Sequence, residues 1–271
     1  MAVTAPQQIE ELSFDDYTKR QKYEVTSEGL VLRSAKIMAT DKFHYHHGAW
    51  EKSPYPGYAI VSMVSTNPGN DELTSRLEKL QRLLTDLWQV PNSCFMLPPD
   101  SFHQTVANTL SAGRFEKYIR SAGIEQNYPA MIQEAFEGLQ DTGRAAQPIT
   151  MQLIGLSIFG SAIGILGIFQ KSTDFQRIVD FREAFYSNAT LNAIDIRRTR
   201  PFIGHITLAY LDGDFTADDR NGLVAACEQI NQEVSNQEMV FKISKTALRR
   251  YDDLSCFHTD PSYPEYSFLN P

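Results

Sequence analysis

Two histidines of this 271-residue chain are each followed, two positions later, by a threonine: His103 by Thr105, and His205 by Thr207. The residues around both pairs are β-branched or aromatic, which is typical of strands. Side chains two positions apart in a strand point to the same face, so each histidine shares a face with its threonine. If the two strands lie together, two imidazoles and two hydroxyls converge on one small volume. Imidazoles act as acid and base near neutral pH, and hydroxyls donate to phosphate oxygens, so this set is suited to cleaving a phosphodiester without a metal.

The same order of expected elements surrounds each pair. An apolar run typical of a strand precedes each of them, at 58–64 and at 162–169, with an amphipathic helix in between. Leucines at helical spacing predict the first helix, over 73–87, and Thr173 opens the second with a capping-box pattern. Helical sequence and a further strand follow each pair, the last strand being expected over 239–248. We therefore predict an α+β fold in which one lobe occurs twice. Other expected elements are a strand over 93–97, helices over 114–141 that break near Gly123 and restart at Pro129, and a helix that begins at Thr216.

Composition excludes several classes of protein. Hydrophobic residues make up 42% of the chain and charged residues 21%, which is ordinary for a globular protein. The net charge of −8 argues against binding of duplex nucleic acid, which needs a basic face, but leaves a small nucleotide or an RNA end open. The three cysteines lack metal-ligand spacing, and the N-terminus lacks the pattern of a signal peptide. We expect a cytoplasmic protein.

The stretch 151–169 is long and apolar enough to be a candidate membrane span. Gly160 and Ser161 in its middle are turn-forming residues, and the β-branched runs on either side have the length of strands. We therefore interpret it as a hairpin of two buried strands, and we expect no contact with a membrane.

The first part of the chain contains a histidine cluster, His44, His46 and His47. A metal site is one interpretation, but no cysteine or carboxylate is spaced to complete it, and a polar loop is favoured. Residues 30–32 and 36–39 are expected to form a short strand or an extended arm. The Pro- and Gly-rich break at 53–57 divides the chain into an N-terminal extension (1–56), a two-lobed unit (57–256) and a C-terminal tail (257–271) that lies over the surface. The lone His258 of the tail is expected to be structural or exposed.

Three arginines precede the second His-x-Thr pair: Arg197, Arg198 and Arg200. Arginine is the side chain best suited to bind phosphate oxygens in pairs. A solvated loop explains the same residues equally well. Arg200, which is nearest to His205, is the one that we single out as a substrate-binding candidate.

The two His-x-Thr strands, each in a lobe of strands and helices, resemble those of the two-histidine (2H) phosphoesterase superfamily, which includes RNA ligase-like 2′,3′-cyclic phosphodiesterases and cyclic nucleotide phosphodiesterases. The sequence around His103, Ser101-Phe102-His103-Gln104-Thr105, is similar to that of a longer bacterial and fungal branch of this superfamily. The resemblance covers residues 57–250 and implies a bilobal α+β fold, with two concave antiparallel sheets facing each other in pseudo-twofold symmetry and helices outside. It also implies that His103 and His205 are the acid and base and that Thr105 and Thr207 bind the phosphate oxygens. Gln104 departs from the superfamily, which usually has an apolar residue there.

The leading hypothesis is a monomeric, metal-independent and cofactor-independent phosphodiesterase that hydrolyses a cyclic phosphate of a nucleotide or RNA end, or a 2′–5′ linkage. The alternative is a non-catalytic module that binds a nucleotide or an RNA end with the same four residues. A metal protein centred on the histidine cluster is the third hypothesis. The sequence leaves open which histidine is the acid and which the base.

Overall fold

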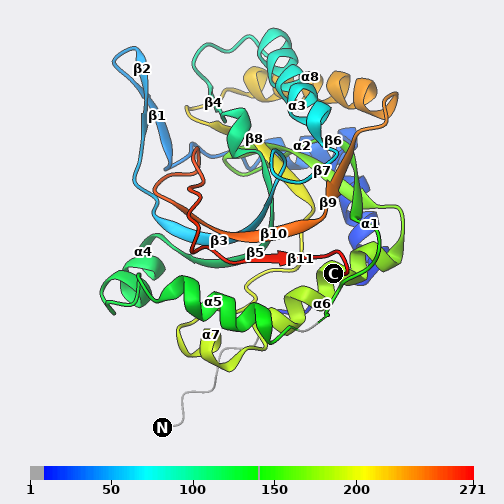
Figure 1. The fold of residues 1–271 in the computed structure, drawn as a ribbon. Helices are drawn as coiled ribbons and strands as arrows, with labels where there is room; N and C mark the ends of the chain where they lie inside the picture. Colours follow the sequence, from blue (N-terminus) through cyan, green and yellow to red (C-terminus); the bar gives the residue numbers. More distant parts are fainter. Residues whose placement is uncertain (1–8, 140) are drawn as a thin grey trace.

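The computed structural model describes residues 9–139 and 141–271, which form helices and antiparallel sheets in an α+β arrangement. Figure 1 shows helices on both outer sides of the molecule and sheets between them. The helices are α1 (Phe14–Glu24), α2 (Ser27–Ser34), α3 (Asp71–Leu87), η1 (Pro99–Ser101), α4 (Ala112–Phe115), η2 (Glu116–Arg120), α5 (Tyr128–Glu137), α6 (Ser172–Tyr186), α7 (Ala189–Ala193) and α8 (Ala217–Ser235). The strands are β1 (Phe43–His46), β2 (Ala49–Lys52), β3 (Gly57–Met63), β4 (Cys94–Met96), β5 (His103–Ser111), β6 (Ile149–Phe159), β7 (Ala162–Phe169), β8 (His205–Leu211), β9 (Val240–Ile243), β10 (Lys245–Tyr251) and β11 (Glu265–Ser267).

Each His-x-Thr strand pairs with the apolar strand that precedes it in the chain. In the four-stranded sheet, whose order is β11-β10-β3-β5, His103 stands opposite Met63. In the five-stranded sheet, whose order is β4-β8-β7-β6-β9, His205 stands opposite Leu166. β1 and β2 form a separate hairpin, which projects from the body of the molecule in Figure 1.

The two halves of the chain exchange strands. β4 and β6, which lie on either side of the first His-x-Thr strand in the sequence, both belong to the sheet of β8. β10, from the end of the chain, pairs with β3 in the sheet of β5. The prediction of a single strand over 239–248 was wrong for this reason, because the segment forms two strands, β9 and β10, in different sheets. The side-chain oxygen of Asn67 accepts from the backbone N–H groups of Ser244 and Lys245 and holds the chain where it passes from one sheet to the other.

The predicted hairpin of buried strands is confirmed. β6 and β7 pair along their length, from Met151 opposite Phe169 to Phe159 opposite Ala162. Gly160, in the turn between them, has the positive φ of 60° that a tight turn requires. Nearly all the residues of β7 are buried. Within the parts of the chain that the structure describes, no helix has the length and apolarity needed to cross a bilayer.

Two predictions on helices were wrong. Residues 30–32 lie in α2 and not in a strand, because Thr26 caps a helix by accepting from the N–H of Gly29, and the helix buries Leu30. α6 begins at Ser172, without the predicted capping box at Thr173. In contrast, α3 has the predicted bounds within a few residues, and α8 begins with a full capping box of Thr216 and Asp219.

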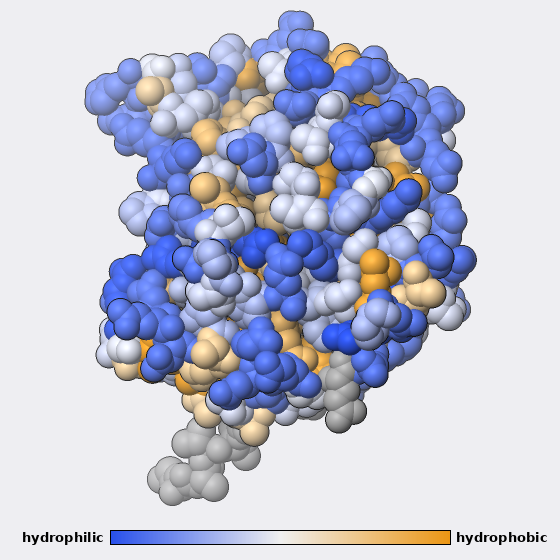
Figure 2. Space-filling view, viewed as in Figure 1, coloured by the Kyte–Doolittle hydropathy of each residue, from blue (hydrophilic) through white to orange (hydrophobic). Residues whose placement is uncertain are grey.

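The N-terminal and C-terminal segments are part of the same hydrophobic core. Tyr17 of α1 and Leu30 of α2 are fully buried in it. The end of the chain, which was predicted to lie over the surface, instead adds β11 and buries Tyr266 and Phe268. The face seen in Figure 2 is mostly hydrophilic, and its hydrophobic residues form small separate groups. α3 and α8 pack over the five-stranded sheet, and α5 packs against β11 of the four-stranded sheet. α6 contacts both sheets, through β6 and β7 of the one and β5 of the other.

Candidate active site

A cavity of about 290 Å³ is lined by both His-x-Thr pairs and by the arginine that was expected to bind substrate. His103, Thr105, His205, Thr207 and Arg200 all line it. β5 and β8, which come from different sheets, lie against each other here. The structure therefore brings the two His-x-Thr pairs together on one volume, and each threonine shares a face with its histidine.

A β-bulge in each of the two His-x-Thr strands changes which of its later residues line the cavity. The pairing of β3 with β5 shifts between Ile60 and Val61, and that of β7 with β8 shifts between Ile163 and Gly164. Each shift reverses which residues face the cavity further along the strand. The residue five positions after each histidine, Asn108 or Tyr210, then lines the cavity.

Sequence reasoning missed these two residues. Strict alternation after His103 and His205 assigns Ala107 and Ala209 to the cavity face, but both alanines are buried on the other side. The available signal was the pair of apolar residues that precedes each of them, Val106-Ala107 and Leu208-Ala209, because two consecutive buried residues break a period of two.

Both imidazoles are anchored in the same way. Nδ1 of His103 lies 2.6 Å from the carbonyl oxygen of Ser101, and Nδ1 of His205 lies 3.1 Å from that of Ile203. A carbonyl oxygen only accepts hydrogen bonds, so Nδ1 carries the proton and donates in each ring. The remaining nitrogen, Nε2, is left as a proton acceptor in both neutral rings.

Burial lowers the pKa of both histidines from 6.5 to about 4. Aromatic rings enclose the imidazoles: Phe257 lies 4.2 Å from His103 and Phe159 lies 5.3 Å from His205, measured between ring centroids. The positive charge of Arg200 lowers the pKa of His205 further. Both rings are consequently neutral bases at pH 7 when the cavity holds no anion.

Two basic side chains line the cavity although the protein is acidic. Lys42 and Arg200 line it, and none of the described residues in its wall is Asp or Glu. Lys42 comes from the segment before β1 and lies over the ring of Tyr55, 4.7 Å from its centroid. Its ammonium also forms an ion pair with the adjacent Asp41, so Arg200 is the main source of positive charge in the cavity wall. In a chain with a net charge of −8, these basic side chains favour an anionic ligand in the cavity.

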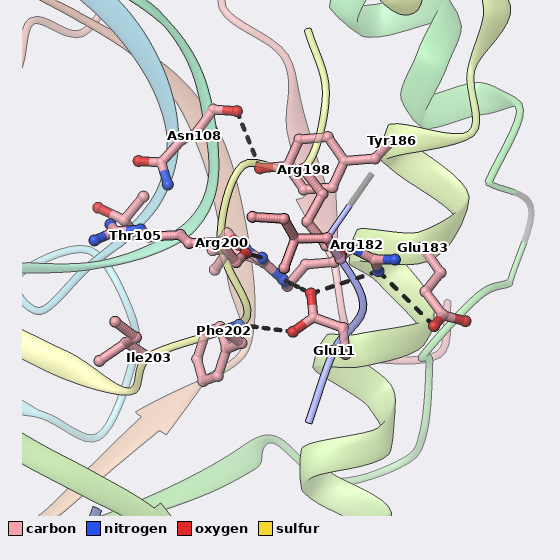
Figure 3. Close-up of polar contacts among 12 residues, drawn as sticks. Glu11, Thr105, Asn108, Arg182, Glu183, Tyr186, Arg198, Arg200, Phe202 and Ile203 are labelled. Atoms are coloured by element: carbon pink, nitrogen blue, oxygen red, sulfur yellow. Dashed lines mark hydrogen bonds and ion pairs between the residues drawn. The ribbon is translucent and has the colours of Figure 1, made fainter. Parts of the chain in front are cut away.

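A buried ion pair positions the segment that presents Arg200 and His205. Arg182, only 2% exposed, donates to Oε1 of Glu11 at 2.6 Å, to the carbonyl oxygen of Val106 at 2.5 Å and to that of Arg200 at 2.9 Å. The other carboxylate oxygen of Glu11 accepts from the N–H of Phe202 at 2.6 Å. Figure 3 shows how these groups join α6, the N-terminal segment and the segment before β8. The N-terminal part of the chain thus fixes the backbone beside the cavity.

The remaining histidines lie elsewhere. His44, His46 and His47 belong to the β1–β2 hairpin, where His44 approaches Asp212 and His46 approaches Glu51. In residues 9–139 and 141–271, no group of three or more His, Cys, Asp or Glu side chains has the arrangement of a metal site.

His258, expected to be structural or exposed, is exposed, and its Nε2 lies 3.1 Å from the carboxylate of Asp252.

Comparison with known proteins identifies a fold and no activity. No family model and no curated protein matches the chain. Among solved structures, the chain is similar to the conserved protein of unknown function ATU0111 from Agrobacterium tumefaciens, with a TM-score of 0.54, 15% identity, and 80% of this chain and 88% of that chain covered. It also matches TT0787 of Thermus thermophilus, with a TM-score of 0.44, 14% identity, and 80% and 98% of the chains covered. The first likeness shows that the α+β fold is shared.

Proposed function

We propose that this protein is a metal-independent phosphodiesterase of the 2H type, which hydrolyses the cyclic phosphate of a nucleotide or RNA end, or a 2′–5′ linkage. In this proposal the two sheets are the two lobes of a duplicated, pseudo-symmetric fold. One observation carries it: His103 and His205 line the same cavity, each with Nδ1 bound to a backbone carbonyl and with Nε2 bound to no group of residues 9–139 and 141–271. Thr105 and Thr207 lie on the same faces as hydroxyl donors.

In the proposed reaction one imidazole acts as base and the other as acid. Nε2 of the base takes a proton from water while the water oxygen forms a bond to phosphorus. The bond from phosphorus to the leaving ribose oxygen breaks, and Nε2 of the other imidazole, in its protonated form, gives that oxygen a proton. The threonine hydroxyls and Arg200 bind the non-bridging oxygens, whose charge increases in the transition state.

The substrate itself supports protonation of the acid. A phosphate monoanion about 4 Å from an imidazolium, at an effective dielectric constant of about 20, stabilises its charge by about 4 kcal/mol, or about 3 pKa units. Starting from a pKa of about 4, the histidine with the bound anion then titrates near neutral pH. One of the two neutral imidazoles becomes an acid when the anion binds, and the charge of the first imidazolium keeps the second ring neutral as the base.

Hydrolysis of 2′,3′-cyclic nucleotides by His103→Asn and His205→Asn tests this function. We expect each variant to lose at least about 100-fold in kcat, because a positioned acid or base contributes about that much or more. His47→Asn is the matched control, since His47 is exposed on the β1–β2 hairpin and its positive φ of 49° suits asparagine. A chelator should leave the wild-type rate unchanged. Full activity in either active-site variant would exclude the mechanism, and binding of nucleotides without turnover by the wild type would instead support the non-catalytic module.

A further inference from the structure

Gln104 lies between the two residues of the first pair, but its side chain contacts the second. It is fully buried, with no exposed surface. Its Oε1 accepts from the backbone N–H of His205 at 2.6 Å, and its Nε2 donates to the carbonyl oxygen of Ile203 at 3.0 Å. The same Nε2 donates to the carbonyl oxygen of Thr105 at 2.7 Å. A single amide therefore connects the two His-x-Thr strands, which belong to different sheets.

The carbonyl of Ile203 has a second partner, Nδ1 of His205, at 3.1 Å. A carbonyl oxygen has two lone pairs and accepts both hydrogen bonds. Gln104 thus fixes both backbone groups that determine where the imidazole of His205 points: the N–H of the residue itself and the carbonyl that binds its ring.

The two histidines differ in this respect. His103 is anchored to Ser101, whose hydroxyl donates to the carbonyl of Pro98 at 2.7 Å within η1, so the support of His103 is local in sequence. The support of His205 comes from the other His-x-Thr strand, which is distant in sequence and belongs to the other sheet. An apolar residue at position 104 would leave the buried N–H of His205 without its acceptor and the carbonyl of Ile203 with one partner fewer.

We propose that Gln104 is a positioning residue for His205. It holds the ring of His205 in the Nδ1–H tautomer and fixes the register between the two strands, so that Nε2 of both imidazoles stays directed into the cavity. The consequence for catalysis rests on the proposed function, whereas the effect on the tautomer does not.

The test is the ¹⁵N spectrum of the imidazoles in wild type and in Gln104→Met, at about pH 8, where both rings are neutral. Methionine nearly preserves the volume of glutamine and removes both polar groups. We expect both rings of the wild type to show the Nδ1–H signature. In Gln104→Met, His205 should change to a mixture of tautomers while His103 stays as it is.

Gln21→Met is the matched control. Gln21 is also a buried glutamine, 1% exposed, and its Nε2 donates to the carbonyl oxygens of Gly204 at 2.7 Å and Gly167 at 3.0 Å. Its replacement removes two hydrogen bonds, one of them to the carbonyl of the Gly204–His205 peptide. It leaves in place both partners of Gln104 at this point, the N–H of His205 and the carbonyl of Ile203. An unchanged His205 signature in Gln104→Met, an equal change in Gln21→Met, or an Nε2–H signature in wild-type His205 would each overturn the proposal.

A second variant, Gln104→Leu, covers the case in which Gln104→Met does not fold. It also lacks both polar groups and can neither accept from the N–H of His205 nor donate to the carbonyl of Ile203, so it should show the same change at His205 alone.

Kinetics then connect the tautomer to the reaction. With a 2′,3′-cyclic nucleotide, Gln104→Met should lower kcat by roughly 10-fold to 100-fold with little change in KM, the size expected for a misplaced catalytic group. Gln21→Met should leave kcat within about 3-fold of wild type. Absence of turnover by the wild type would refute the proposed function while the ¹⁵N spectra still decide the role of Gln104.

Discussion

Acidification should destabilise this protein through His103 and His205, and the effect can be measured without any substrate. Both rings have a pKa of about 4 in the folded protein, below the ordinary value of 6.5 that applies to the unfolded chain. Between these two values the unfolded chain binds protons and the folded protein does not. The free energy of unfolding therefore falls as the pH is lowered from 6.5 towards 4, and the penalty is absent above 6.5.

The size of the effect follows from the two pKa values. At about pH 5, this difference in pKa lowers the free energy of unfolding by about 2 kcal/mol for each ring. Solvent that reaches the cavity screens the effect and reduces it to about 1–2 kcal/mol for each ring. The charges of Arg200, His103 and Arg20 oppose protonation of His205, and no carboxylate in the described cavity wall compensates. Wild type should lose about 2–4 kcal/mol through these two rings between about pH 8 and pH 5.

Urea unfolding of wild type and of the double variant His103→Asn/His205→Asn, at about pH 8 and pH 5, isolates this contribution. The rest of the chain titrates alike in both proteins, so the difference in their pH dependence belongs to the two rings. His258→Asn is the control, because that histidine is exposed. Sulfate, whose charge is constant over this range, should restore stability to the wild type at pH 5 and not to the double variant. Parallel pH profiles for the two proteins would refute the depressed pKa values.

Two further predictions concern the support of the site. Glu11→Ala should lower the free energy of unfolding by about 3–5 kcal/mol, because it leaves the buried guanidinium of Arg182 without its carboxylate partner. Glu183→Ala, at an exposed position, should lower it by less than about 1 kcal/mol in the same urea titration. Gly204→Ala should lower the free energy of unfolding by about 1–3 kcal/mol, since its Cβ would collide with the hydroxyl of Tyr17 in the core. Gly113→Ala, where a Cβ meets nothing within 4 Å, should leave the melting temperature unchanged or higher. Equal effects of the two variants in either pair would contradict the contacts on which these expectations depend.

Local patterns predicted the parts of the fold that local chemistry determines. Leucine spacing located α3, the Gly160-Ser161 turn located the β6–β7 hairpin, and the Thr216 box located the start of α8. Each depends on residues that contact one another within a few positions. The same holds for the shared face of His103 and Thr105, which needs only a strand.

The rest of the site depends on contacts between distant residues, which spacing in the sequence does not encode. Asn108 faces the cavity because a bulge in the pairing with β3 changes the phase of β5. Lys42 belongs to the site because its side chain packs over the ring of Tyr55. Glu11 matters because a buried arginine of α6 needs a carboxylate. None of these partners is near in sequence to the group that it positions.

Gln104 shows how such a contact can still leave a trace in the sequence. A polar residue between the two functional side chains of a strand points to the opposite face, which in this fold is the interior. Burial of an amide is unfavourable unless its donor and acceptor are both satisfied, so a buried glutamine requires partners that lie close in space. Here the partners are the backbone groups of Ile203 and His205. A polar residue at an expected core position therefore indicates a tertiary hydrogen bond, although only the structure identifies the second His-x-Thr strand as its partner.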